Sequence, residues 1–156
     1  MLKPVRSKAS GARDSEFAIV ASRYNARYVD AMVRAAQAEL KRAGAKRVQL
    51  VRVPGAFEIP VVAARLARAM TGRVDAIICL GVILRGATVH AEHIGTAVSN
   101  ALMGIQLSCG VPVIHEVLLL ENEEQAKARC LGTKHNRGRE AAQTAIEMAR
   151  VMASLG

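Results

Sequence analysis

The sequence predicts an α/β domain in which helices cover both faces of a parallel sheet. Short, nearly uninterrupted apolar runs alternate along the chain with segments that show helical spacing of apolar residues. Uninterrupted apolar runs are typical of strands that are buried on both faces. Strands that alternate with helices form a parallel sheet through right-handed crossovers, which gives three layers in the order α/β/α.

Four apolar runs with polar or turn-like boundaries are predicted as strands, so we expect a sheet of about four strands in a flavodoxin-like arrangement. The runs cover residues 17–22, 48–53, 74–81 and 111–119. The 156 residues of the chain suffice for one such domain with a core of its own.

Five segments that carry apolar residues on one face are predicted as helices. They span residues 26–43, 58–70, 91–108, 122–129 and 139–153. In the first of them, Val29, Met32 and Leu40 share the apolar stripe, and Gly44 is the stop signal. Helices follow all four strands, which completes the α/β/α pattern.

Residues 1–14 are expected to form a loose N-terminal tail, and residues 15–156 a single domain. The tail is basic but lacks the apolar run of a secretory signal, and no stretch reads as a membrane span. Cys79, Cys109 and Cys130 lie far apart and form no Cys-x-x-Cys pair, which disfavours disulfides and zinc. Free thiols suit a reducing cytoplasm, which is the expected location.

The chain carries 22 Lys and Arg against 13 Asp and Glu, a formal net charge of +9. Such a charge can attract nucleic acid, an anionic surface or a phosphorylated metabolite. Nucleic-acid platforms interleave basic residues with aromatic ones. In this chain the basic residues are scattered and lack such aromatic neighbours. Nucleic-acid binding is therefore not expected, and charge alone does not choose between the other two partners.

Ligands of open parallel sheets bind at the carboxyl ends of the strands, so the loops that follow the strands are candidate sites. After the first strand, Tyr24 offers a ring that can stack on a flat heterocycle, and Asn25 offers both a donor and an acceptor. After the second, Gly55 permits close backbone approach, and the Glu58 carboxylate could accept hydrogen bonds from hydroxyls. An ordinary turn and an ordinary helix start are the alternatives.

The segment from Arg85 to His90, RGATVH, is the most informative one. It combines a cation, a flexible glycine, a hydroxyl and an imidazole immediately before a predicted helix. Backbone N–H groups and the Thr88 hydroxyl could cradle phosphate oxygens, and His90 could carry protons near neutral pH. The alternative is a helix-capping threonine beside an incidental histidine. His93 shares a helical face with His90, but no third ligand accompanies them, so no metal site is predicted.

Three cations lie in the segment RCLGTKHNRG between the last two predicted helices. Arg129, Lys134 and Arg137 could hold a phosphate through forked or point-charge contacts, or could belong to a solvated basic loop. His115 lies inside the fourth apolar run, where a histidine is either buried and hydrogen-bonded or part of a pocket wall.

From about Phe17 onward, several motifs in order resemble the lumazine synthase family: SRYN, VPGAFEIP, LGVILRGATVH, GVPVI, NEEQAKARCLGTK and AAQTAIEMA. The resemblance implies the condensation of 5-amino-6-(D-ribitylamino)uracil with 3,4-dihydroxy-2-butanone 4-phosphate. The products are 6,7-dimethyl-8-ribityllumazine, phosphate and water, the penultimate step of riboflavin biosynthesis. No cofactor and no metal are implied.

The resemblance also implies a role for each matching position. Tyr24 matches the aromatic residue that stacks on the pyrimidine, and Glu58 the acceptor of ribityl hydroxyls. His90 matches the proton-transfer histidine, and Arg129 joins Gly86 to Thr88 at the phosphate. The implied catalytic residues are thus His90 and Arg129. The implied substrate-binding residues are Tyr24, Asn25, Ala56, Phe57, Glu58, Val82, Ile83, Gly86, Ala87, Thr88, His115, Lys134 and Arg137.

Two departures from the family pattern affect the expected pocket wall. Tyr24 stands where Phe or Trp is usual, and His115 occupies a position that is frequently apolar. The family assembles as homopentamers, some of which build icosahedral shells, with active sites shared between subunits. A homo-oligomer is therefore implied, and riboflavin synthase is a further candidate partner. The alternatives are a non-catalytic lumazine- or flavin-binding protein on this scaffold and a basic shell-forming or nucleic-acid-associated assembly.

Overall fold

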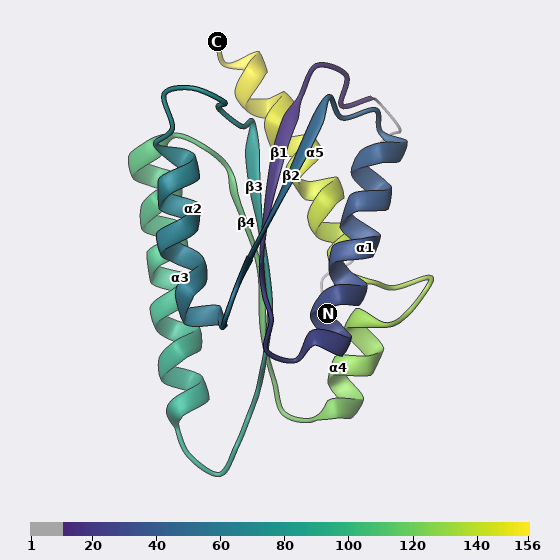
Figure 1. Cartoon of the computed structure of the whole chain (residues 1–156), viewed down its shortest axis with the longest axis vertical. Coiled ribbons are helices and arrows are strands. Elements are labelled where there is room, and N and C mark those ends of the chain that lie inside the picture. The colour runs from purple at the N-terminus through teal and green to yellow at the C-terminus, as the bar shows by residue number, and fades with distance from the viewer. Residues whose placement is uncertain (1–10) are drawn as a thin grey trace.

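The expected three-layer α/β/α fold is confirmed by a computed structural model, which describes residues 11–156 (Figure 1). Four parallel strands form one sheet in the order β2-β1-β3-β4. The strands are β1 (Glu16–Ser22), β2 (Arg47–Val53), β3 (Ala76–Leu84) and β4 (Val113–Leu120). Because all four run the same way, their carboxyl ends lie at one end of the sheet.

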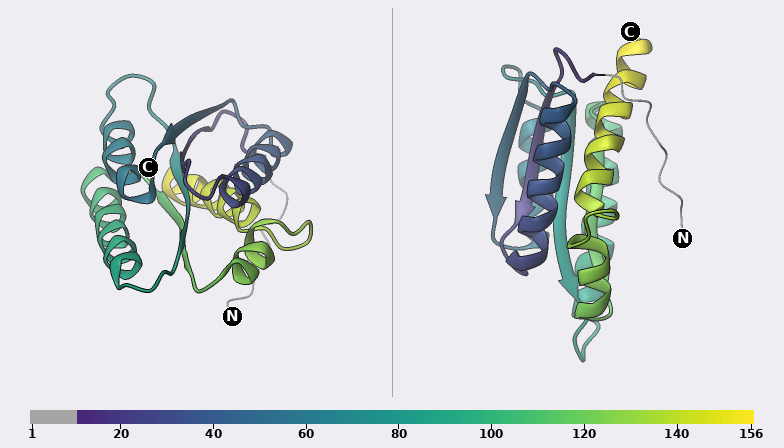
Figure 2. Two further views of the ribbon diagram at one scale, coloured as in Figure 1. Left: turned by 60° about the horizontal axis from the view of Figure 1, so that its bottom comes forward. Right: turned by 90° about the vertical axis from the view of Figure 1, so that its right-hand side faces the viewer.

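Helices cover both faces of this sheet. On one face lie α1 (Ala26–Arg42), α4 (Glu123–Cys130) and α5 (Arg137–Ser154). On the other lie α2 (Ile59–Ala67), which follows the short 3₁₀ turn η1 (Ala56–Glu58), and α3 (His90–Cys109). The side view in Figure 2 shows the α5 layer running alongside the sheet.

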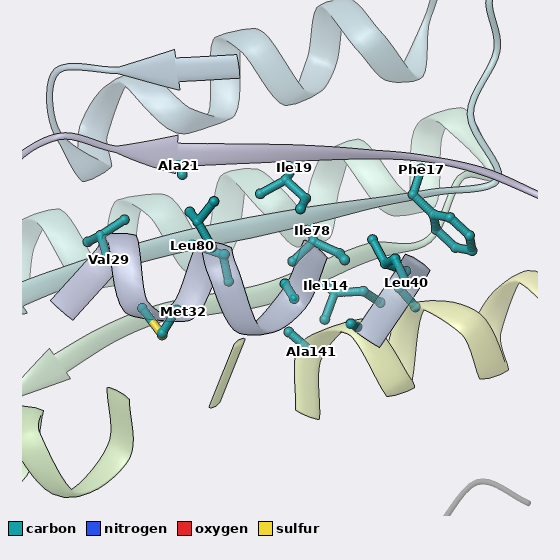
Figure 3. Close-up of a cluster of buried hydrophobic side chains, with 14 of the residues drawn as sticks. Phe17, Ile19, Ala21, Val29, Met32, Leu40, Ile78, Leu80, Ile114 and Ala141 are labelled. Carbon is teal, nitrogen blue, oxygen red and sulfur yellow. The ribbon is translucent and has the colours of Figure 1, made fainter. Parts of the chain in front are cut away.

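The core has two halves, one on each face of the sheet, because strand side chains alternate between faces. In β1, Phe17, Ile19 and Ala21 point towards α1 and α5, whereas Ala18 and Val20 point towards α2 and α3. All five are fully buried. Figure 3 shows the first half, where strand side chains meet the apolar stripe of α1. A strand that is buried on both faces reads as a continuous apolar run, as the sequence indicated.

Element boundaries differ from the predicted ones at several places. The strand expected over 74–81 extends to Leu84, because the β3 ladder continues alongside β4 as far as Leu120. The helix expected over 58–70 is α2, which starts at Ile59 and ends at Ala67. Its end follows from local hydrogen bonding: the Ala69 N–H donates to the Leu66 carbonyl in a tighter turn that α-helical bonding cannot continue.

Residues 1–10 of the predicted tail lie outside the described residues. Packing begins before residue 14, because Ala12 is buried and its N–H donates to the Ala43 carbonyl at 2.6 Å. Within residues 11–156, no helix combines the length and the apolar character needed to cross a bilayer.

The start of α5 is fixed against α1 at a crossing that only glycine permits. The buried Asn136 side chain caps α5 by accepting from the Gly138 N–H at 2.8 Å, and it donates to the Cys130 carbonyl at 2.7 Å. A Cβ built on Gly138 would lie 2.1 Å from the Met32 carbonyl oxygen of α1. The backbones of the two helices therefore touch at this point.

Replacing Gly138 with alanine tests this close approach. Because the methyl group must push α1 and α5 apart, Gly138→Ala is expected to lower the free energy of unfolding by about 1–3 kcal/mol. Gly104→Ala is the matched control, since a Cβ on that helical glycine meets nothing within 4 Å; it should stabilise the helix by up to about 1 kcal/mol. Equal urea midpoints for the two variants would contradict the crossing.

Candidate active site

A pocket of about 880 Å³ opens at the carboxyl ends of β1, β2 and β3, on the face that α2 and α3 cover. Many of the residues expected at the site line it together. These are Tyr24, Asn25, Ala56, Phe57, Glu58, Val82, Ile83 and His90. Five further lining residues were not among the expected site residues: Gly55, Leu84, His93, Ile94 and Ala97. Three of those lie in α3, where the three- and four-residue spacing from His90 could have found them.

The first two loops lock together through Tyr24 and Gly55. The Tyr24 N–H donates to the Pro54 carbonyl at 3.0 Å. A Cβ on Gly55 would lie 2.9 Å from two carbons of the Tyr24 ring, so the ring rests directly on the Gly55 backbone. The side chain is nevertheless 68% exposed. One face of the ring is thus supported and the rest is free to stack on a planar ligand.

Glu58 is fixed by the same glycine. The Gly55 N–H donates to Glu58 Oε2 at 2.9 Å across the η1 turn. No other hydrogen bond reaches this carboxylate from the described part of the chain, and Glu58 is exposed at the pocket. One carboxylate oxygen is therefore used to set the orientation, while the other can accept from ligand hydroxyls.

Asn25 joins the first loop to the third strand. Its Nδ2 donates to the Val82 carbonyl at 2.7 Å. Its backbone has φ of 57°, in the left-handed region that asparagine tolerates better than most residues. One N–H of the amide is thus committed to the fold. The second N–H and the side-chain oxygen remain for a ligand.

The residues of the segment RGATVH differ in their position relative to the pocket. His90 is the first residue of α3 and lines the pocket, whereas Gly86, Ala87 and Thr88 are exposed beside it and do not line it. The Thr88 hydroxyl accepts weakly, at 3.4 Å, from the His90 N–H, which supports a helix-start role for the threonine within one chain.

Arg85, the cation of that segment, serves the fold. Its guanidinium pairs with Glu92 in the first turn of α3 and, at 2.9 Å, with Glu121 after β4. Its own N–H donates to the Leu120 carbonyl at 2.8 Å. Arg85 therefore ties the third loop to the end of β4, and its guanidinium is paired with two carboxylates.

The other expected site residues lie elsewhere in the chain. Arg129 is exposed on α4, within the helix rather than in the loop that follows, and on the opposite face of the sheet from the pocket. Lys134 is exposed in the loop before α5. His115 faces α3 from β4, where its ring contacts Ser99.

Arg137 is held by two carboxylates at the start of α5. Its Nε and one terminal nitrogen donate to the two oxygens of Glu116 at 3.0 and 2.8 Å, and the other terminal nitrogen donates to Glu140 at 2.8 Å. Glu116 is buried in β4, and this burial raises the pKa of its carboxyl against the opposing effect of Arg137. A fixed, doubly paired guanidinium offers directed N–H groups rather than a free positive charge.

The fold and the position of the pocket define the class of protein: an α/β domain that binds a small molecule where loops converge at the ends of parallel strands. A family model described as 6,7-dimethyl-8-ribityllumazine synthase matches residues 14–153. The chain belongs to this family.

Two relatives illustrate how far the similarity extends. A 6,7-dimethyl-8-ribityllumazine synthase from Xanthomonas oryzae pv. oryzae (strain PXO99A) is 44% identical over 140 residues, which cover 88% of this chain and 90% of that protein. One from Stenotrophomonas maltophilia (strain R551-3) is 43% identical over 143 residues, covering 90% and 91%. A de novo designed Rossmann fold protein superposes with a TM-score of only 0.42 at 15% identity, over 73% of this chain and 91% of that one.

Substitutions at Asn25 separate its two contributions. Asn25→Gly removes the hydrogen bond to Val82 but keeps the left-handed backbone at no cost, so we expect a loss of about 0.5–1.5 kcal/mol in unfolding free energy. Asn25→Ala loses the same bond and adds about 1–2 kcal/mol of backbone strain. Denaturant titration of both variants checks this order. An alanine variant as stable as the glycine variant would contradict the role of the backbone.

Proposed function

We propose that this chain catalyses the synthase reaction of its family in the pocket at the ends of β1, β2 and β3. In this reaction, 5-amino-6-(D-ribitylamino)uracil and 3,4-dihydroxy-2-butanone 4-phosphate condense to 6,7-dimethyl-8-ribityllumazine, with release of phosphate and water. The proposal rests above all on one observation: a supported aromatic ring, an oriented carboxylate and a histidine line the same pocket.

The pocket suits the uracil substrate. The Tyr24 ring can stack on the flat pyrimidine, and Val82 and Ile83 can border that ring with apolar surface and backbone groups. The free oxygen of Glu58 can accept from the hydroxyls of the ribityl chain. Ala56 and Phe57, between these groups, shape the wall of the pocket.

His90 is the proposed proton carrier. The amino group of the uracil attacks the butanone carbonyl, so a carbon–nitrogen bond forms and the carbonyl oxygen must be protonated before it leaves as water. Later a proton must be removed as the phosphate departs. An imidazole at the start of α3 can serve both steps, a contribution of about 10²–10⁴ in rate. Holding two substrates side by side can supply much of the remaining acceleration.

The phosphate requires cations that this pocket lacks in one chain. Among residues 11–156, no Lys or Arg lines it, while a phosphate is best held by arginine forks and backbone N–H groups. Gly86 to Thr88 supply N–H groups at its margin. Arg129 and Arg137 belong to α4 and α5, which cover the opposite face of the sheet, and Lys134 lies in the loop between those helices. We therefore propose that a neighbouring copy contributes these cations and His115, in a homopentamer with shared active sites.

We place this enzyme in the cytoplasm, which suits its three free cysteines. Two of the thiols are inert: burial raises the pKa of Cys79 to about 12 and that of Cys130 to about 11. Riboflavin synthase is the proposed consumer of the lumazine product. Neither a metal nor a cofactor enters the proposed reaction.

The central test mixes the two substrates with the protein and follows the fluorescent lumazine. His90→Ala should lower kcat by about 10²-fold with little change in KM. Arg129→Ala should mainly raise KM for the phosphorylated substrate, by about 10-fold or more, because it removes a charged phosphate contact. Lys127→Ala is the matched control, since Lys127 is an exposed cation on the same helix.

If the unaltered protein binds the lumazine product but does not turn over the two substrates, the proposed enzyme is instead a non-catalytic lumazine-binding protein. Full activity in both His90→Ala and Arg129→Ala would contradict the roles proposed for these two residues, but not the proposed reaction.

Complementation tests the sharing of sites between copies. When His90→Ala and Arg129→Ala chains are co-expressed and assemble at random, about one quarter of the shared sites carry both native residues. The mixed assembly should thus recover about a quarter of the native activity, far above either variant alone. If both residues act within the same chain, no site in the mixture is intact and the activity stays at the level of the variants.

A further inference from the structure

Side chains of the same protein cap two backbone N–H groups at the free edge of the sheet. β4 is an edge strand, since it pairs only with β3. The carbonyls of Pro112 and Leu120 accept from N–H groups of Ile77 and Arg85, so even-numbered residues of this stretch direct their backbone groups towards β3. In a parallel ladder the alternate residues face the other way. The N–H groups of Val113, His115, Val117 and Leu119 therefore point to the free edge.

Two of these four, the N–H groups of Val113 and Val117, have side-chain acceptors in the described chain. The Val113 N–H donates to Gln106 Oε1 of α3 at 2.9 Å. The Val117 N–H donates to His115 Nδ1, two residues back in the same strand, at 3.1 Å. An edge strand with unpaired N–H groups is a template for unwanted strand pairing, and side chains that occupy those groups remove the template.

The bonds around His115 determine its tautomer. Because Nδ1 accepts from Val117, it carries no proton, so in the neutral ring the proton is on Nε2. Nε2 lies 2.7 Å from the Ser99 hydroxyl, which itself donates to the Gly95 carbonyl at 2.8 Å. Ser99 can therefore accept from Nε2–H. Every donor in this chain of bonds meets an acceptor, and both ring nitrogens are in use.

We propose that His115 caps the Val117 N–H at the free edge of β4 only as the neutral Nε2–H tautomer, and that acid uncovers this N–H by protonating the ring. A proton on Nδ1 would set two donors against each other, the ring N–H and the Val117 N–H. The cap at Val113 does not share this behaviour, because the Gln106 amide does not titrate. This inference does not depend on the proposed reaction.

No charged partner on the neighbouring elements of the described chain offsets the change. From β3, the residue in register with His115 is Cys79, a buried thiol that stays protonated because burial raises its pKa to about 12. From α3, the nearby ionised group is Glu92, which lines the same shallow depression as Ser99 and Val117 but pairs with Arg85. Burial of the ring lowers the pKa of His115 from its ordinary value of 6.5.

The lowered pKa of His115 determines how the stability of the protein depends on pH. A histidine whose pKa is lowered by folding binds fewer protons in the folded than in the unfolded protein below pH 6.5. The stability that the neutral ring contributes is complete above this pH. It is lost as the pH falls through the lower, folded-state pKa.

Hydrogen exchange of the intact assembly, measured by mass spectrometry with residue-level fragmentation, tests the proposal between about pH 8 and pH 5. Each rate is divided by its intrinsic exchange rate at that pH. The Val117 amide should lose about two- to tenfold protection on acidification, the change that corresponds to one hydrogen bond. The Val113 amide is the internal control and should keep its protection. Hydrogen exchange at the imidazole carbon of His115, followed in the same experiment, should report a pKa below 6.5 for this ring.

Three variants make the test specific. His115→Phe keeps a ring of similar size but cannot accept, so Val117 should be unprotected at every pH while Val113 is unchanged. Gln106→Leu should give the converse pattern. Ser99→Ala removes the acceptor for Nε2–H, which stabilises the protonated ring more than the neutral one, and should lower the pKa of His115 further below its ordinary value. The proposal is overturned if Val117 and Val113 keep the same protection throughout, or if Val117 stays protected in His115→Phe.

Discussion

The parallel pairing of β1 with both of its neighbours is the constraint on which the rest of the molecule depends. Every backbone ladder in the sheet runs in one direction, so the loops after β1, β2 and β3 must emerge side by side. Their packing then fixes the site. Tyr24 rests on Gly55, Gly55 orients Glu58, and Asn25 bonds to the end of β3. A change in register would separate all of these contacts at once.

Local patterns in the sequence predicted the layers, the four strands and the loops that form the pocket. They succeeded because a strand such as β1, buried on both faces, leaves an unmistakable apolar run. The length of β3 was not predictable, since it depends on pairing with β4, which begins about 30 residues later in the chain. The ion pairs of Arg85 with Glu121 and of Arg137 with Glu116 join distant residues in the same way. No local spacing encodes them.

The distribution of charge has a physical reason. A flat, largely neutral ring binds best against aromatic and apolar surface, where a buried cation would pay a large desolvation penalty. A phosphate needs the opposite environment. Residues 11–156 separate the two demands. No Lys or Arg among them lines the pocket at the strand ends, while Arg129 belongs to α4, which covers the opposite face of the sheet, and Lys134 to the loop after α4. This separation is the observation behind the proposed sharing of sites between copies.

The hydrogen bonds of His115 explain how β4 accommodates an imidazole between the edge of the sheet and α3. A ring nitrogen without a partner costs free energy where it is shielded from water. Here both nitrogens are in use, because Val117 donates to Nδ1 and Ser99 can accept from Nε2–H. A proton on Nδ1 would remove the first of these bonds, so this arrangement belongs to the neutral ring and not to the charged one.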